Sequence, residues 1–235
     1  MAETIVRNID RIRQVISALC VKTGRSPREI TVVAVTKGRT VEQIKEIIAQ
    51  DLADIGENRI QEALIKYDTM PGARYAPRLK WHMIGHLQTN KAPEAVRLFD
   101  LIQSVDSSRL AEAISKEAGK INKHQDILLE VKTSPEESKF GLKPEDTLAV
   151  FQKISQLPHL NIKGLMTIAP LADNPKTSRP YFRTLRELSN KIEWRPETAD
   201  HRPILSMGMS DDFAVAIEEG SNMIRLGRAI FESQE

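Results

Sequence analysis

The stretch Thr31-Val32-Val33-Ala34-Val35-Thr36-Lys37-Gly38 decides the fold class, because a mostly β-branched apolar run ends there on a lysine and a glycine. A run of this kind is typical of a parallel strand that is buried on both faces. Thr40-Val41-Glu42-Gln43 follows as a capping box, the pattern that begins a helix. Strand, short turn and helix predict an α/β protein with Lys37 at the carboxyl end of a strand.

Strand-like and helix-like segments alternate through the remaining sequence of this 235-residue chain. We predict eight strands, at residues 32–36, 53–56, 80–84, 101–105, 126–131, 163–168, 204–207 and 223–226. Helical patterns separate them at residues 41–49, 109–118, 147–156, 181–192 and 212–218. An amino-terminal helix with a stripe of isoleucines from Ile5 to Ile16 is expected to close the outer ring.

This count of strands and helices is that of a (β/α)₈ barrel. We therefore expect residues 1–235 to form one α/β domain, a single TIM barrel. A doubly wound open sheet is the alternative.

Composition excludes several classes of protein. The net charge of +2 is too small to indicate a nucleic-acid partner, and 28% charged with 40% hydrophobic residues is ordinary for a soluble globular protein. Cys20 is the single cysteine, so no internal disulfide can form, which fits a reducing compartment. The first 13 residues lack the apolar core of a signal peptide, and no apolar stretch approaches the ~20 residues that span a bilayer. We expect a cytoplasmic protein with no membrane partner.

Candidate ligand-binding residues stand at the carboxyl ends of the predicted strands, which converge on one mouth in a barrel. They are Lys37, Asn58, His82, Met166, Ser206, Arg225, Gly227 and Arg228. Gly227-Arg228-Ala229 is a glycine turn leading into a short helix, where backbone N–H groups can bind a phosphate. The small residues of 206–210 allow a ligand to approach closely, and Ser210 is expected to cap the next helix.

Two of these residues have both a structural and a functional interpretation. Lys37 is either a solvated lysine at a strand end or a nucleophilic amine. Arg225 lies in an otherwise apolar strand and needs acceptors, either a carboxylate such as Glu57 or the ring nitrogen of a ligand. Because a guanidinium only donates, a pyridine nitrogen bound to it stays unprotonated. An amine, a phosphate cradle and an arginine for a ring nitrogen together indicate a pyridoxal 5′-phosphate (PLP) site.

Seven segments, at residues 34–37, 55–62, 81–91, 139–142, 164–168, 205–211 and 224–231, carry a specific resemblance. Together they resemble, in order, the YggS/PROSC family of pyridoxal phosphate homeostasis proteins. The resemblance implies an alanine racemase-like barrel that holds PLP as a Schiff base on Lys37.

The same resemblance implies a role for each candidate residue. Ser206, Gly227 and Arg228 would hold the phosphate, the last two mainly through backbone N–H groups, and Arg225 would face the pyridine nitrogen. The pocket would be lined by Asn58, His82 and Met166. Some relatives carry a small hydroxyl residue in place of Arg228, so the backbone contact is the one expected there.

An enzyme of this chemistry would need an acid or base on each face of the substrate, and Lys37 serves one face. Tyr67, Tyr75 and Tyr181 lie in predicted loops or helix starts. We therefore expect a non-catalytic PLP carrier and buffer, a monomer whose partners are PLP and recipient apoenzymes. The alternatives are a small PLP-dependent amino-acid racemase or decarboxylase, and a lysine aldolase without cofactor.

Two further patterns have ordinary explanations. His82 and His86 lie four residues apart, but the segment reads as a strand entering a loop and offers no third ligand, so we expect no metal. Asp211 and Asp212 are expected to complement a helix dipole.

Overall fold

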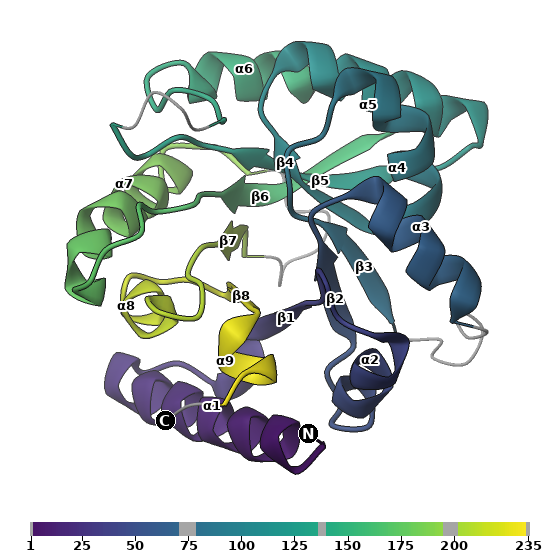
Figure 1. Cartoon of the computed structure of the whole chain (residues 1–235). Helices are drawn as coiled ribbons and strands as arrows, with labels where there is room; N and C mark the ends of the chain where they lie inside the picture. Colours follow the sequence, from purple (N-terminus) through teal and green to yellow (C-terminus); the bar gives the residue numbers. More distant parts are fainter. Residues whose placement is uncertain (1, 71–78, 136–139, 195–201, 234–235) are drawn as a thin grey trace.

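The computed structural model describes residues 2–70, 79–135, 140–194 and 202–233, and these form a closed barrel of eight parallel strands inside a ring of helices (Figure 1). The barrel predicted from the sequence is confirmed. The strands are β1 Thr31–Val35, β2 Asp54–Glu57, β3 Lys80–Met83, β4 Leu101–Val105, β5 Gln125–Glu130, β6 Leu160–Met166, β7 Ile204–Ser206 and β8 Met223–Leu226. The largest shift from a predicted end is at β6, which begins at Leu160 rather than at residue 163.

A helix follows each strand, and those at residues 60–69 and 92–98 lie outside the predicted helical segments. The helices are α1 Ala2–Thr23, α2 Val41–Ile48, α3 Ile60–Thr69, α4 Ala92–Leu98, α5 Ser108–Lys120, α6 Thr147–Ile154, α7 Arg179–Ser189, α8 Phe213–Glu218 and α9 Arg228–Phe231. The predicted capping box of α2 is present, since Gln43 N–H donates to Thr40 Oγ1 over 3.3 Å and Thr40 N–H donates to Gln43 Oε1 over 3.0 Å. None of the helices described here is long and apolar enough to cross a bilayer.

Helix α1 completes the outer ring, as expected, where it contacts α2, α8 and α9 (Figure 1). Its stripe of Ile5, Ile9, Ile12 and Ile16 is buried, and each such side chain contributes about 1.5–3 kcal/mol relative to exposure. Asn8 Nδ2 donates to Ile230 O over 3.0 Å and so ties α1 to α9. The helix therefore fixes the segment that follows the last strand.

Side-chain alternation divides the barrel wall into an inner and an outer surface. Inside, one apolar layer consists of Val33, Leu101, Leu128, Met166 and Met223. Strands β1 and β8 close the barrel with Val33 paired to Arg225. Because Arg225 lies two residues after Met223, it also faces inward and continues this layer toward the mouth.

Candidate functional site

Lys37 lies at the mouth, in the turn that follows β1. The strand ends at Val35, two residues earlier than the lysine, so Lys37 stands above the last strand pair and its side chain is exposed. Lys37 is therefore in contact with solvent and is not withdrawn from water. Its amine is instead open to ligands that enter from solvent.

A group of polar residues on the outer surface of the wall, three of them buried and Glu62 partly exposed, holds the backbone around Lys37. We call Thr36, Glu57, Glu62 and Lys66 the outer cluster. Thr36 Oγ1 donates to Glu57 Oε1 over 2.5 Å, and Lys66 Nζ of α3 donates to Thr36 O over 2.5 Å and to Glu57 Oε1 over 2.7 Å. Lys66 therefore fixes the carbonyl that directly precedes Lys37.

Glu62 fixes the other side of the same turn. Its carboxylate accepts from Gly38 N–H and, over 2.6 Å, from Lys66 Nζ. Burial raises the pKa of Glu62, but these hydrogen bonds and the lysine charge outweigh it and leave the pKa below its ordinary value. Both peptide groups that flank Lys37 are thus anchored to α3.

Glu57 faces away from Arg225. It lies one residue after Gly56, which pairs with inward-facing Val35, so its side chain points to the outer surface. Burial raises the pKa of Glu57, and hydrogen bonds from Lys66 and Thr36 oppose that rise. The interpretation of Arg225 as the salt-bridge partner of Glu57 is therefore wrong.

Arg225 instead spans the inside of the mouth from β8 to β6. Its Nη1 donates to Ser206 Oγ over 2.6 Å and its Nη2 donates to Thr167 O over 2.9 Å. The side chain is 3% exposed, and burial lowers its pKa to about 10 against the opposing charges of Glu130 and Asp212. The guanidinium therefore remains a cation at neutral pH.

A continuous series of hydrogen bonds leads from Arg225 across the barrel. We call its five residues the interior chain: Arg225, Ser206, Gln103, His82 and Asp54. Ser206 Oγ donates to Gln103 Oε1 over 2.6 Å, and Gln103 Nε2 lies 2.9 Å from His82 Nδ1. His82 Nε2 lies 2.9 Å from Asp54 Oδ1. Ser206 and His82 are thus brought together with Arg225, but as buried members of the wall.

The predicted phosphate rim lies beside Lys37. Gly227 directly follows β8, and a Cβ placed on it would lie 3.5 Å from the Cβ of Val35. The amine and the rim therefore share one pole of the barrel. Arg228 is exposed and its guanidinium donates to Asp211, so its side chain serves the loop while its backbone begins α9.

Ser210 joins the loop after β7 to α9. Its Oγ accepts from Ala229 N–H over 3.1 Å, so the prediction that it caps the following helix α8 is wrong. The N-cap of α8 is Asp212, whose Oδ1 accepts from Met209 N–H over 2.7 Å. Gly208 allows this loop to bend, since it has φ +94° and a Cβ there would lie 2.5 Å from that of Ala216.

Asn58 and Met166 line the same end of the barrel. Asn58 directly follows β2, and its Oδ1 is buried without a hydrogen-bond partner in the described structure. Gly85 permits close contact there, because a Cβ on it would lie 2.3 Å from Asn58 O. Met166 ends β6 and is fully buried in the inner apolar layer. An unpartnered amide oxygen is the kind of acceptor that a ligand's donor satisfies.

The interpretation of the sequence missed Gln103 and Glu130, two inward-facing polar residues. Glu130 ends β5 and is 7% exposed, and burial together with the nearby Asp106 charge raises its pKa to about 7, against the opposing charge of Arg225. The sequence feature that could have identified Gln103 and Glu130 is a polar side chain inside an otherwise apolar strand. The same signal did single out Arg225.

The remaining candidates lie elsewhere. His86 stacks on Phe140 at 3.6 Å and its Nδ1 lies 3.3 Å from Asp106 Oδ2, so it does not join His82. The described residues hold no group of three potential metal ligands. Tyr67 packs edge-on against Trp81, and Tyr181 belongs to α7. Tyr75 is outside the described residues.

Comparison with known proteins agrees with this architecture. The model for the alanine racemase N-terminal domain matches residues 3–234. The pyridoxal phosphate homeostasis protein of Aquifex aeolicus is 40% identical over 223 residues, covering 95% of each chain. The chain belongs to the family of pyridoxal phosphate homeostasis proteins. The resemblance to the pyridoxal phosphate homeostasis proteins is thereby confirmed.

Solved structures agree as well. PipY of Synechococcus elongatus with PLP bound is 35% identical, with a TM-score of 0.77 and coverage of 92% of this chain and 99% of PipY. Alanine racemase of Clostridium difficile is 14% identical with a TM-score of 0.74, and the match covers 97% of this chain but 56% of the racemase. The second likeness shows the shared barrel alone.

Proposed function

We propose that this chain binds PLP at the mouth of its barrel, holds it covalently and reversibly on Lys37, and buffers the cell's supply of the cofactor. The observation that carries the proposal is the placement of Lys37, Arg225 and Gly227 at one pole, on adjacent strands β1 and β8. Family membership supports it, as does the bound PLP of the similar PipY structure.

Lys37 supplies the nucleophile. PLP, when bound, supplies an aldehyde that condenses reversibly with an amine. The anchored peptide groups on both sides of Lys37 direct its side chain, while its exposure leaves it open to exchange with solvent. A fixed but accessible amine suits loading and release.

Arg225 orients the ring. Two of its five N–H donors go to Ser206 and Thr167, which leaves others for a ring nitrogen. A guanidinium that retains its proton keeps that nitrogen unprotonated and makes the ring a weaker electron sink. This favours storage of the cofactor over catalysis.

The phosphate would be held by Ser206 and by the backbone N–H groups of Gly227 and Arg228. Asn58 would satisfy its buried Oδ1 at the ligand, and Met166 would form the floor. His82 would act indirectly, through Gln103. The pocket is therefore polar at its rim and apolar beneath.

We further propose that the whole chain works as one barrel domain and as a cytoplasmic monomer that passes PLP to apoenzymes. The related homeostasis protein of Aquifex aeolicus is matched over 95% of its length. Light scattering should give the mass of one chain. A stable dimer would contradict the monomer.

The direct test is to add PLP to purified protein, reduce with borohydride and map the modified peptide. We expect one adduct, on Lys37. Lys37→Ala should lose it, while Lys45→Ala, which removes another exposed lysine, should retain it. An unchanged adduct in Lys37→Ala would overturn the assignment.

A second experiment separates the carrier from an enzyme. The PLP-loaded protein is incubated with each amino acid in deuterated water, and exchange of the α-proton is followed by NMR. A carrier is expected to show no exchange above free PLP. Robust exchange would establish the racemase or decarboxylase alternative, since it requires a working base.

A further inference from the structure

The interior chain has a definite direction of hydrogen bonding. Ser206 accepts from Arg225 and donates its only proton to Gln103 Oε1. Gln103 Nε2 then donates to His82 Nδ1, so the neutral imidazole carries its proton on Nε2 and donates it to Asp54. Each group is satisfied in the order Arg225, Ser206, Gln103, His82, Asp54.

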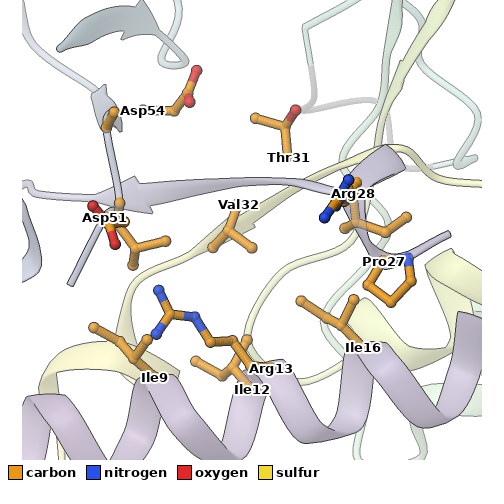
Figure 2. A pocket seen from close by; sticks show the side chains of 13 residues that line it. Ile9, Ile12, Arg13, Ile16, Pro27, Arg28, Thr31, Val32, Asp51 and Asp54 are labelled. Atoms are coloured by element: carbon orange, nitrogen blue, oxygen red, sulfur yellow. The ribbon is translucent and has the colours of Figure 1, made fainter. Parts of the chain in front are cut away.

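The far end of this chain reaches solvent at the opposite pole. Asp54 begins β2, and its side chain is 23% exposed. Asp54 is one of the residues around a cavity between α1 and the amino ends of β1 and β2, and its carboxylate points away from Ile9 and Ile12 of α1 (Figure 2). A proton can therefore reach Asp54 without passing through the mouth.

Ser206 cannot serve a phosphate in this arrangement, because its hydroxyl has one proton and Gln103 accepts it. A contact from Ser206 to a phosphate oxygen requires that proton to turn away. Gln103 must then present its amide N–H₂ to Ser206 and its carbonyl to His82. The same heavy-atom positions permit this, since amide oxygen and nitrogen are nearly equal in size.

We propose that binding of a phosphate ester at Ser206 reverses the interior chain and loads one proton on the His82–Asp54 pair. The inference rests on the proposed function, because it requires the phosphate of PLP at Ser206. In the reversed chain Ser206 donates to the phosphate, Gln103 donates to Ser206, and His82 Nδ1–H donates to Gln103. The proton between His82 Nε2 and Asp54 Oδ1 stays in place. The proton on His82 Nδ1 is therefore an additional one, which the pair takes up from solvent. No bond to carbon forms or breaks.

The surroundings of His82 are consistent with a proton bound there. Asp54 on β2 is its direct anionic partner, and Asp126 at the amino end of β5 is a further carboxylate on the inner surface. Gln103 on β4 and the Met223 thioether on β8 are neutral. The opposing cations are Arg225, which Ser206 and Gln103 separate from His82, Lys80, which lies opposite Asp54 in the sheet, and Lys163, whose Nζ lies 3.9 Å from Asp126 Oδ1.

The imidazole ¹⁵N shifts of His82 test the reversal directly. The chain has five histidines, and His82→Gln assigns the signal. In the free protein we expect a neutral ring protonated on Nε2. Saturation with pyridoxine 5′-phosphate, which has no aldehyde, should protonate Nδ1. An Nδ1–H tautomer in the free protein, or an unchanged ring in the complex, would overturn the proposal.

Calorimetry in two buffers of different ionisation enthalpy counts the protons taken up with pyridoxine 5′-phosphate. The wild type should take up about one proton more than Asp54→Asn, and its affinity should therefore fall more steeply with pH, by up to about tenfold per pH unit. His124→Gln, an exposed histidine outside the chain, should behave as the wild type. Equal uptake by Asp54→Asn and the wild type would contradict the linkage.

The two proposals fail in different ways. If PLP leaves no reducible adduct on Lys37 and pyridoxine 5′-phosphate does not bind, the proposed function fails and the proton linkage falls with it. If the adduct forms and pyridoxine 5′-phosphate binds, but His82 keeps its tautomer, only the reversal is wrong. Asp54→Asn removes a charge from a partly exposed residue, so it tests the linkage even if His82→Gln does not fold.

Discussion

The outer cluster and the interior chain both bury charged groups in the wall of one barrel, and they differ in what completes them. The outer cluster is completed by a cation of the protein itself: Lys66 serves two carboxylates, and both peptide groups beside Lys37 are anchored. The interior chain begins at Arg225, a buried cation that forms no ion pair within 4 Å with a carboxylate of the described residues. Neighbouring residues of one strand point to opposite surfaces of the wall, so a shift of one residue moves a side chain from the outer cluster's surface to the interior.

Buried charges on the two surfaces of the barrel wall therefore have different roles. Glu57 points outward and its Oε1 is paired with Lys66 of α3, so it stabilises the wall. Arg225 points inward and keeps donors for a ligand. The outer cluster should therefore govern stability, and the interior chain should govern the affinity for PLP.

Breaking the outer cluster should produce the largest effect. Lys66→Met leaves Glu57 buried without its cation, and loss of one partner of a buried pair typically costs about 3–5 kcal/mol. Chemical denaturation should show this as a lower free energy of unfolding. Because the Thr36 carbonyl before Lys37 also loses its donor, loading with PLP should slow.

Glu57→Gln with Lys66→Met is the matched control, since it removes both charges. The double variant should recover much of the lost stability. A single Lys66→Met variant as stable as the wild type would show that the outer cluster is not what holds this turn.

The pH dependence of Glu130 gives the next largest effect. Its pKa is raised from 4.5 to about 7, so the folded state binds a proton that the unfolded state has lost between these values. Stability therefore falls as pH rises through this window, by about 3 kcal/mol at most. Glu130→Gln should be more stable than the wild type at pH 8, with the gain vanishing near pH 4.5. A gain independent of pH would show that ionisation is not its cause.

Arg225→Ala tests the interior chain. One charge-assisted hydrogen bond to a ligand is typically worth about 1.5–3 kcal/mol, so the affinity for PLP should fall at least about tenfold and the absorbance of the bound chromophore should change. Stability should change less, because burial already disfavours this cation. Equal losses of folding and of binding would make Arg225 a structural residue.

The smallest effects are expected from removing two hydroxyl groups, those of Thr40 and Ser210, each of which accepts a hydrogen bond from a backbone N–H. Thr40→Ala and Ser210→Ala each remove a side-chain acceptor of a helical N–H, at about 1 kcal/mol. Only Ser210 lies against α9 at the phosphate rim, so only its loss should also weaken PLP binding. Titration with PLP distinguishes them, and equal affinities for the two variants would remove Ser210 from the rim.

The sequence predicts the barrel and the position of its mouth, because both depend on local pattern. Apolar runs give the strands, and Lys37 and Arg225 stand out as charges at strand ends. The strand count then brings β1 beside β8. The alternation of strands with helices and the closure of eight strands into a barrel are enough to predict most of the architecture.

What the sequence could not predict depends on register between strands. Glu57 was offered as a partner of Arg225, and only its pairing shows that it faces outward. The contact of Gln103 with His82 requires the register of β3 with β4, where Leu101 lies opposite His82. Ser210 reaches α9 through a loop whose path no local pattern fixes.

A crystal structure of the chain grown with PLP tests the central claim most directly. We predict continuous density from Lys37 Nζ into the mouth, the ring nitrogen within hydrogen-bonding distance of Arg225, and the phosphate at Ser206 and the Gly227 turn. PLP attached to a different lysine, or seated at the amino-end cavity beside Asp54, would contradict the account.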